Sequence, residues 1–171
     1  MKLHSVELQT LTPEVLQVFG AQPPLLTAGD RDGCNTMTIG WCQMGRLWNL
    51  PMCTVYVRPE RHTFSFMESK EYFTVSVLPS EQKKTVAFCG ANSGRDVDKI
   101  ASCGLTVRYG AGDAPFFDEA EWVLVCRKLY AQDLTADCVL PAGEKIIPPF
   151  YGEKGGWHRV YTGQVVEAYA R

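Results

Sequence analysis

The sequence predicts a mainly β protein, an antiparallel barrel with a few short helices. About seven segments are rich in β-branched and aromatic residues, turns rather than long helices join them, and the helical segments are short. A doubly wound sheet would need long helices alternating with the strands. At 171 residues, of which 46% are hydrophobic, the chain fits one domain spanning residues 1–171.

The expected strands follow the β-branched and aromatic residues along the chain. They cover residues 25–28, 35–42, 53–58, 72–78, 105–109, 122–131 and 158–169. Between the first two lies a turn, residues 29–33, that contains two glycines and two aspartates. This turn chemistry predicts that the first two strands pair as an antiparallel hairpin.

Four short helices are expected, over residues 12–20, from 63 to the strand at 72, over 80–90 and over 96–102. The first has Thr12 as N-cap and Pro13 at its first position. The third is expected to begin at a Ser80 cap and to end at Gly90. The loop 140–151 contains three prolines and is long for a compact domain, so we expect a lid or an intersubunit arm.

The charge balance excludes several classes of partner. Lys and Arg number 17 against 19 Asp and Glu, a formal net charge of −2, so no domain-wide basic field is available for nucleic acid or an anionic membrane. The first seven residues lack the apolar core of a signal peptide, and no apolar run approaches membrane-spanning length. We therefore expect a cytoplasmic protein without nucleic-acid or membrane partners.

Seven cysteines are present, an odd number without a C-x-x-C pair, and most lie within apolar segments. We interpret them as reduced thiols that serve as small buried hydrophobes, with a redox or metal role as the alternative. The three histidines are not at metal-ligand spacing from any cysteine, so no metal is expected.

Residues 58–63, R-P-E-R-H-T, directly follow an expected strand and enter a short helix. If the segment stays extended, Arg58, Arg61 and Thr63 converge on one anion, because a guanidinium fork matches a phosphate and the helix start adds free N–H groups. The alternative is two solvated arginines beside a turn, followed by an ordinary N-cap.

Residues 90–99, G-A-N-S-G-R-D-V-D-K, form a second candidate anion site. Its glycines allow close approach of backbone amides, and Ser93, Arg95 and Lys99 add a hydroxyl and two charges. Lys99 is expected about one turn inside the helix that follows. The spacing matches neither a P-loop nor a Rossmann fingerprint. Asp96 and Asp98 are alternatively ordinary first-turn carboxylates.

Residues 35–41, N-T-M-T-I-G-W, place Thr36, Thr38 and Gly40 on one face of the expected strand and apolar residues on the other. A small polar face offers a shallow wall for a flat amphipathic ring, and Trp41 and Trp48 can cover it. Either tryptophan can equally be a core or dimer-interface residue.

Read together, these three motifs, with F-T-V-S-V at 73–77 and the segments 121–130 and 158–163, resemble the flavoredoxin-like branch of the flavin reductase family. The resemblance covers nearly the whole chain. It implies a Greek-key split β-barrel that binds FMN, expected as a homodimer with the flavin near the interface. The chain departs from many relatives at Gly40, where they have serine, and at His62, where they have tyrosine.

The resemblance also implies the site residues. Those expected beside the isoalloxazine are Asn35, Thr36, Met37, Thr38 and Trp41. Those expected to hold the phosphate and ribityl chain are Arg58, Arg61, Thr63, Asn92, Ser93, Gly94, Arg95 and Lys99. No catalytic side chain beyond the flavin is expected, although backbone amides or Lys99 are candidates to stabilise negative charge on the reduced ring.

The implied function is an FMN-dependent oxidoreductase that takes a hydride from NADH or NADPH and passes electrons to free flavin, a protein or a small acceptor. Two alternatives share the same site: a flavoredoxin-type electron carrier, and a flavin-binding or storage module without nicotinamide turnover. A fourth reading is a barrel whose basic loops only solubilise it, and a protein without affinity for FMN would favour that one.

Overall fold

The computed structural model describes residues 4–6, 22–152 and 156–171. The helix expected over residues 12–20 lies outside them. The strands are β1 (His4–Ser5), β2 (Leu25–Asp30), β3 (Gly33–Thr38), β4 (Cys42–Leu47), β5 (Leu50–Val57), β6 (Tyr72–Val77), β7 (Val107–Tyr109), β8 (Pro115–Phe117), β9 (Trp122–Asp133) and β10 (Arg159–Ala170). The α-helices are α2 (His62–Ser69), α3 (Lys83–Ala91) and α4 (Lys99–Cys103).

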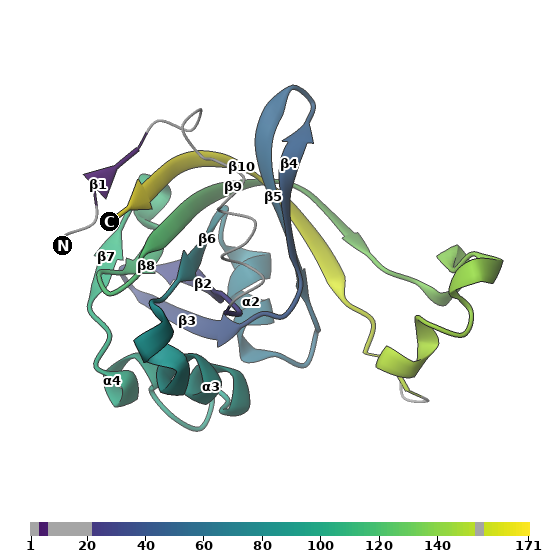
Figure 1. The fold of residues 1–171 in the computed structure, drawn as a ribbon, viewed down its shortest axis with the longest axis horizontal. Coiled ribbons are helices and arrows are strands. Elements are labelled where there is room, and N and C mark those ends of the chain that lie inside the picture. The colour runs from purple at the N-terminus through teal and green to yellow at the C-terminus, as the bar shows by residue number, and fades with distance from the viewer. Residues whose placement is uncertain (1–3, 7–21, 153–155) are drawn as a thin grey trace.

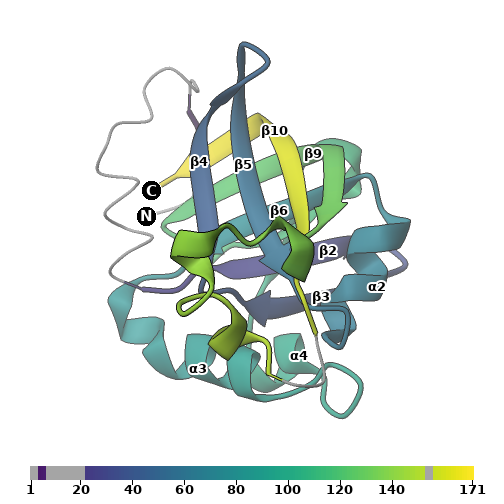
Figure 2. The same cartoon turned by 90° about the vertical axis from the view of Figure 1, so that its right-hand side faces the viewer.

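One strongly curved antiparallel sheet forms the barrel (Figures 1 and 2), and its strand order is β3-β2-β6-β9-β10-β5-β4. β1 also pairs with the end of β10, while β7 and β8 form a separate two-stranded sheet. The edge strands β3 and β4 are joined by residues 39–41 and are not paired with each other in the described part. The predicted fold class, a mainly β split barrel, is therefore confirmed.

The central strands are buried on both faces, which explains their nearly continuous apolar sequences. On β9, Leu124 and Cys126 belong to the cluster inside the barrel, whereas Val123 and Val125 belong to a second cluster that includes Phe117. Complete burial of such a side chain contributes about 1.5–3 kcal/mol. The two clusters pack on opposite faces of the sheet and stabilise it.

The β2–β3 hairpin is confirmed, with a two-residue turn at Arg31 and Asp32 and antiparallel pairing of Asp30 with Gly33. The single strand expected over residues 35–42 is wrong. β3 ends at Thr38, the chain bends at Gly40, and Cys42 opens β4 on the other side of the barrel. β4 is a largely exposed edge strand that contains Gln43, Gly45 and Arg46, so its sequence carries little strand character.

The third helix differs from prediction at both ends. A short 3-10 turn, Ser80–Gln82, precedes α3, whose N-cap is Gln82 without a side-chain cap bond, so the Ser80 cap is wrong. Gly90 lies inside α3 rather than at its end. A Cβ at this position would lie 3.2 Å from Cβ of Thr38, so glycine allows the helix to approach β3 closely.

The fourth helix is shorter than expected, and Lys99 is its first residue rather than one turn inside. Asp98 caps it by accepting hydrogen bonds from the backbone N–H groups of Ile100 and Ala101, both at 3.0 Å. Gly104 follows in the left-handed conformation, with φ of 63°, which glycine commonly adopts just after a helix.

Residues 134–152 form an extension, here called the arm, between β9 and β10. Figure 1 shows it reaching away from the barrel in light green. It contains three 3-10 turns, Ala136–Cys138, Pro141–Gly143 and Pro148–Phe150. Leu140 is 74% exposed and Ile146 is 65% exposed, so the arm presents apolar side chains to its surroundings.

All seven cysteines are free thiols, and Cys53, Cys89 and Cys126 are completely buried. Burial raises the pKa of Cys34, as do the nearby carboxylates of Asp98 and Asp30. Of the helices that the structure describes, none has the length and apolar character needed to cross a membrane.

Candidate functional site

A first cavity, cavity A, lies where the chain passes from β3 to β4 and encloses about 330 Å³. One wall is formed by residues 37–41, and the opposite wall by Tyr56, Arg58 and His158. Val57 of β5 pairs with Arg159 of β10, and this register brings His158 beside Arg58. Residues about one hundred positions apart therefore meet at one cavity.

Aromatic side chains cover cavity A. The centroid of the Trp41 ring lies 4.6 Å from that of His158 and 5.5 Å from that of Phe150. It also makes an edge contact with Tyr56, with 6.4 Å between the ring centroids. Tyr151 bonds the imidazole through its hydroxyl, 3.1 Å from Nδ1 of His158. Phe150 and Tyr151, at the C-terminal end of the arm, thus contact side chains that line cavity A.

Burial, with a smaller contribution from the Arg58 charge, lowers the pKa of His158 to about 4. Because the folded-state pKa lies below the ordinary value of about 6.5, the unfolded chain binds the proton more readily between these values. We therefore expect the free energy of unfolding to fall as the pH drops from about 6.5 to about 4. Urea titrations at several pH values measure this, and His158→Gln should flatten that part of the profile. An unchanged profile in the variant would assign the pH dependence to other groups.

A second cavity, cavity B, encloses about 180 Å³ and shares Met37 and Arg61 with cavity A. Its walls are the start of α2 and the loop that follows α3. The Arg61 guanidinium donates to the Gly90 carbonyl at 3.0 Å, and that of Arg95 donates to the Glu60 carbonyl at 3.1 Å. The backbone N–H groups of His62 and Thr63, which begin α2, have no intrahelical acceptor and are further donors at residues that line the cavity.

Lys99, the first residue of α4, lines cavity B, and only 4% of its surface is exposed. Its ammonium donates to the carbonyls of Thr36 at 2.8 Å and Cys89 at 2.9 Å. Burial lowers its pKa, because the charged form is poorly solvated there. Among the described residues no carboxylate forms an ion pair with Lys99, so this buried cation lacks a negatively charged partner.

The structure brings most of the predicted site residues to these two cavities. Cavity A is lined by Met37, Thr38, Trp41, Arg58 and Arg61. Cavity B is lined by Met37, Arg61, Thr63, Asn92, Ser93, Gly94, Arg95 and Lys99. Asn35 lines neither and instead borders a third cavity, and Thr36 lines none of the three.

The placements of Asn35, Thr36 and Arg58 differ from prediction, and Asn35 does so because it lines neither cavity A nor cavity B. Thr36 is fully buried, and its hydroxyl donates to the Leu26 carbonyl, so its side chain is no part of a wall. Arg58, Arg61 and Thr63 do not converge on one site, because a turn closed by a hydrogen bond from the Arg61 N–H to the Arg58 carbonyl interrupts the extended segment. Arg58 meets Arg61 in cavity A, whereas Thr63 meets Arg61 in cavity B. The Arg58 guanidinium instead donates to the Phe150 carbonyl at 2.5 Å.

Thr63 also differs in detail. Its hydroxyl does not cap α2, whose N-cap is Arg61, but accepts a hydrogen bond from Nδ2 of Asn35 at 2.7 Å. This bond joins α2 to β3 at the floor of cavity B.

Tyr56 and His158 line cavity A although neither was among the predicted site residues. Strand alternation could have identified Tyr56. Val55 and Val57 point into the core, so Tyr56 and Arg58 lie on the other face. His158 reaches the cavity only through the pairing of β10 with β5, a long-range contact that no local pattern reveals.

Comparison with known proteins agrees with this geometry. The model of the flavin reductase like domain matches residues 17–171. The chain is 25% identical to the flavoredoxin of Methanosarcina acetivorans, with a TM-score of 0.66, over 88% of this chain and 69% of that one. No curated protein is detectably similar to the chain.

Two further structures share the fold. An FMN-binding domain of a flavin reductase-like enzyme from Shewanella baltica is 21% identical with a TM-score of 0.68, covering 98% of this chain and 76% of that one. An FMN-binding protein from Thermus thermophilus is 21% identical with a TM-score of 0.67, covering 87% and 70%. Because the family model spans nearly the whole described barrel and both cavities, the chain belongs to the flavin reductase like domain family.

Proposed function

We propose that the protein binds FMN across cavities A and B and acts as an oxidoreductase, taking a hydride from NADH or NADPH and passing electrons to free flavin, a protein or a small acceptor. The observation that carries this proposal is the buried Lys99 ammonium without a carboxylate partner in the described residues. A phosphate in cavity B supplies the missing negative charge.

The residues that line the two adjoining cavities fit the two halves of FMN. Arg61, Arg95 and Lys99 would hold the phosphate together with the α2 start, while Met37 and Trp41 would contact the ring. Bound FMN supplies the two-electron and one-electron chemistry. Arg58 and Arg61 are the cations of cavity A, so they, rather than Lys99, would stabilise negative charge on the ring.

The absorbance spectrum tests the proposal. We expect the purified protein, loaded with FMN and freed of excess, to show a flavin band that bleaches on anaerobic addition of NADH or NADPH. A band that persists with both donors would contradict the reductase function. No band after reconstitution would contradict flavin binding altogether.

A flavoredoxin-type electron carrier is the second candidate, because the similarity to the flavoredoxins extends over most of the chain. Such a carrier would be reduced by a protein rather than by a nicotinamide. Rapid reduction by dithionite without reduction by NADH or NADPH would favour it, and a storage module would in addition show no electron transfer to acceptors.

Trp41→Ala is expected to weaken FMN and riboflavin binding alike, by about 0.5–1.5 kcal/mol beyond the loss of buried area, because both ligands share the ring that packs on Trp41. Calorimetric titration with each ligand measures the change. Trp48→Ala is the matched control, since Trp48 is 54% exposed at the β4–β5 turn and lines none of the three cavities. A loss for FMN alone would contradict ring packing on Trp41.

We also propose that the protein is a cytoplasmic homodimer whose arm contacts the second copy. The exposed apolar side chains of Leu140, Ile146 and Phe150 support this assembly. Light scattering on a sizing column should show a dimer for the native chain and a monomer for the double variant Leu140→Glu, Ile146→Glu. A native monomer would contradict the proposal.

A further inference from the structure

The imidazole of His158 lines cavity A and is held there in one orientation. Its Nδ1 atom lies 3.1 Å from the Tyr151 hydroxyl, and its ring packs on Trp41 with 4.6 Å between the ring centroids. Tyr151 in turn stacks on Trp157, with 4.0 Å between those centroids. Nε2 of His158 has no hydrogen-bond partner among the described residues, so one nitrogen of a fixed imidazole remains free at the cavity.

The bond to Tyr151 is compatible with a proton acceptor at Nε2. A hydroxyl can accept from an Nδ1–H group or donate to a bare Nδ1. When Nδ1–H donates, Nε2 carries a lone pair and can take up a proton, and the imidazolium keeps the same bond to Tyr151. Burial raises the pKa of Tyr151, so the phenol stays neutral and adds no charge beside the imidazole.

The groups around His158 favour its neutral form. Burial and the Arg58 charge lower its pKa to about 4, while Glu60 acts weakly in the opposite direction. Tyr56 of β5 also has a pKa raised by burial, and Arg61 is a second cation of cavity A. Among the described residues no carboxylate lines this cavity or forms an ion pair with His158. A stable imidazolium therefore requires a negative charge from a ligand.

A flavin in cavity A would supply that charge only when it is reduced. Two added electrons leave negative charge on the ring unless a further proton accompanies them. A unit charge about 5 Å from the imidazole, at an effective dielectric constant of about 20, changes its proton affinity by about a hundredfold. This effect is large enough to move His158 from mainly neutral to substantially protonated in weakly acidic solution.

We propose that His158 accepts a proton when the flavin in cavity A is reduced, and that Tyr151 is the positioning residue that keeps Nε2 free for this proton. The inference rests on the proposed function, because the flavin supplies the negative charge. A hydride donor delivers two electrons and one proton to the flavin. The second proton comes from water and binds Nε2 of His158, so two electrons and two protons are taken up in all.

NMR of the FMN complex, with ¹⁵N in the three histidines, tests the proposal directly. Titrations with pH are compared for the oxidised complex and for the complex reduced anaerobically by dithionite. We expect the proton affinity of His158 to rise by about a hundredfold on reduction, and its Nδ1–H tautomer to dominate in the oxidised complex. Loss of the signal in His158→Gln assigns it.

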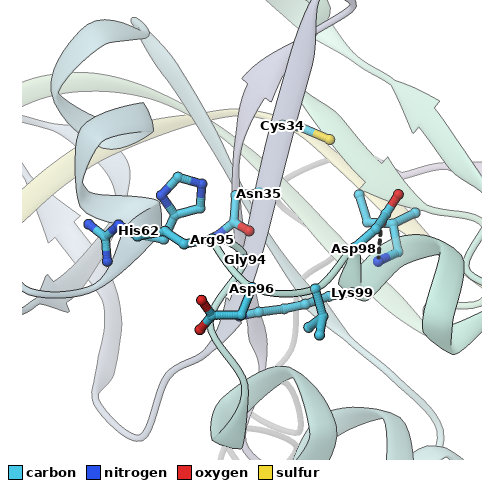
Figure 3. Close-up of a pocket in the computed structure, with 10 residues that line it drawn as sticks. Cys34, Asn35, His62, Gly94, Arg95, Asp96, Asp98 and Lys99 are labelled. Atoms are coloured by element: carbon cyan, nitrogen blue, oxygen red, sulfur yellow. Dashed lines mark hydrogen bonds between the residues drawn. The ribbon is translucent and has the colours of Figure 1, made fainter.

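His62 is the internal reference. It lies at the start of α2, beside Asn35 and the loop that carries Arg95 (Figure 3), and it lines cavity B rather than cavity A. The phosphate expected there keeps its charge when the flavin is reduced. The proton affinity of His62 should therefore change by less than about threefold on reduction, since only the more distant ring gains charge.

The midpoint potential reports the same proton by linkage. For a two-electron couple a tenfold change in affinity corresponds to about 30 mV. The potential of the native protein relative to that of His158→Gln should therefore rise by about 60 mV as the pH falls from above to below both pKa values of His158. His4→Gln, on the exposed strand β1, is the control and should follow the native chain.

Tyr151→Phe keeps the aromatic ring that stacks on Trp157 and removes only the hydroxyl. We expect the Nδ1–H tautomer to lose its dominance, and the gain in proton affinity on reduction to fall below about tenfold. An unchanged tautomer and gain would overturn the positioning role of Tyr151.

A His158 whose proton affinity changes on reduction no more than that of His62 would overturn the proposal while leaving FMN binding intact. Equal pH dependence of the potential in the native chain and in His158→Gln would also overturn it. Absence of FMN binding would instead overturn the proposed function itself.

Discussion

Lys99→Met is expected to weaken FMN binding by about 1.5–3 kcal/mol, the range for hydrogen bonds to charged groups, while riboflavin binding hardly changes. Riboflavin lacks the phosphate, so it gains nothing from the ammonium. The stability of the flavin-free protein should change little, because removal of the buried charge offsets the loss of the two hydrogen bonds to the Thr36 and Cys89 carbonyls. A buried cation without a charged partner is costly, and Met fills a similar volume without that cost.

Titration of both ligands, together with thermal unfolding of the flavin-free protein, measures these effects. Lys128→Met is the matched control, because burial also lowers the pKa of Lys128 while its ammonium donates to the Met67 carbonyl, away from the three cavities. Equal losses of FMN and riboflavin affinity in Lys99→Met would show that Lys99 supports the packing of α3 on β3 instead of holding a phosphate.

Gly94→Ala is expected to destabilise the protein by about 1–3 kcal/mol, the usual cost of overpacking, and to weaken FMN binding. An added Cβ would lie 1.9 Å from Oδ1 of Asn35 and 3.0 Å from Cδ2 of His62. Asn35 cannot swing away without breaking its hydrogen bond to Thr63. The loop must therefore move outward, which takes Ser93 and Arg95 away from cavity B.

Urea unfolding and FMN titration of this variant are compared with Gly45→Ala, whose added Cβ would meet no atom within 4 Å on the exposed strand β4. The control should stay within about 0.5 kcal/mol of the native chain. Native stability and affinity in Gly94→Ala would mean that the loop accommodates a methyl group, and that its close packing is not what positions the phosphate donors.

Much of the candidate site could be predicted because its donors sit in short contiguous motifs. The segments 58–63 and 90–99 each carry their cations and hydroxyls within ten residues, and both do reach cavity B. The direction of individual side chains within the segment 58–63 was not predicted correctly. Arg58 and Arg61 are only three residues apart, yet one turn directs them to different partners, the Phe150 and Gly90 carbonyls.

The predictions for the segment 35–42 failed because the residue types did not indicate which positions pair with other strands and which are buried. β4 carries Gln43, Gly45 and Arg46, which few strands would favour, and it forms because β5 beside it offers a complete set of hydrogen-bonding partners. Thr36 was read as part of a polar wall, but helices pack on that side of β3 and bury it completely.

The sequence by itself determined the local features, since turns and helix ends depend on neighbouring residues. These features are the β2–β3 hairpin, the glycine just beyond α4 and the chemical types of the donors. Only the tertiary structure decided what surrounds each donor. The burial of Lys99 without a carboxylate partner in the described residues and the arrival of His158 at cavity A depend on strands and helices far apart in the chain. The solvation and charge pairing of a side chain depend on the groups that packing brings around it. Local sequence patterns therefore do not reveal either property.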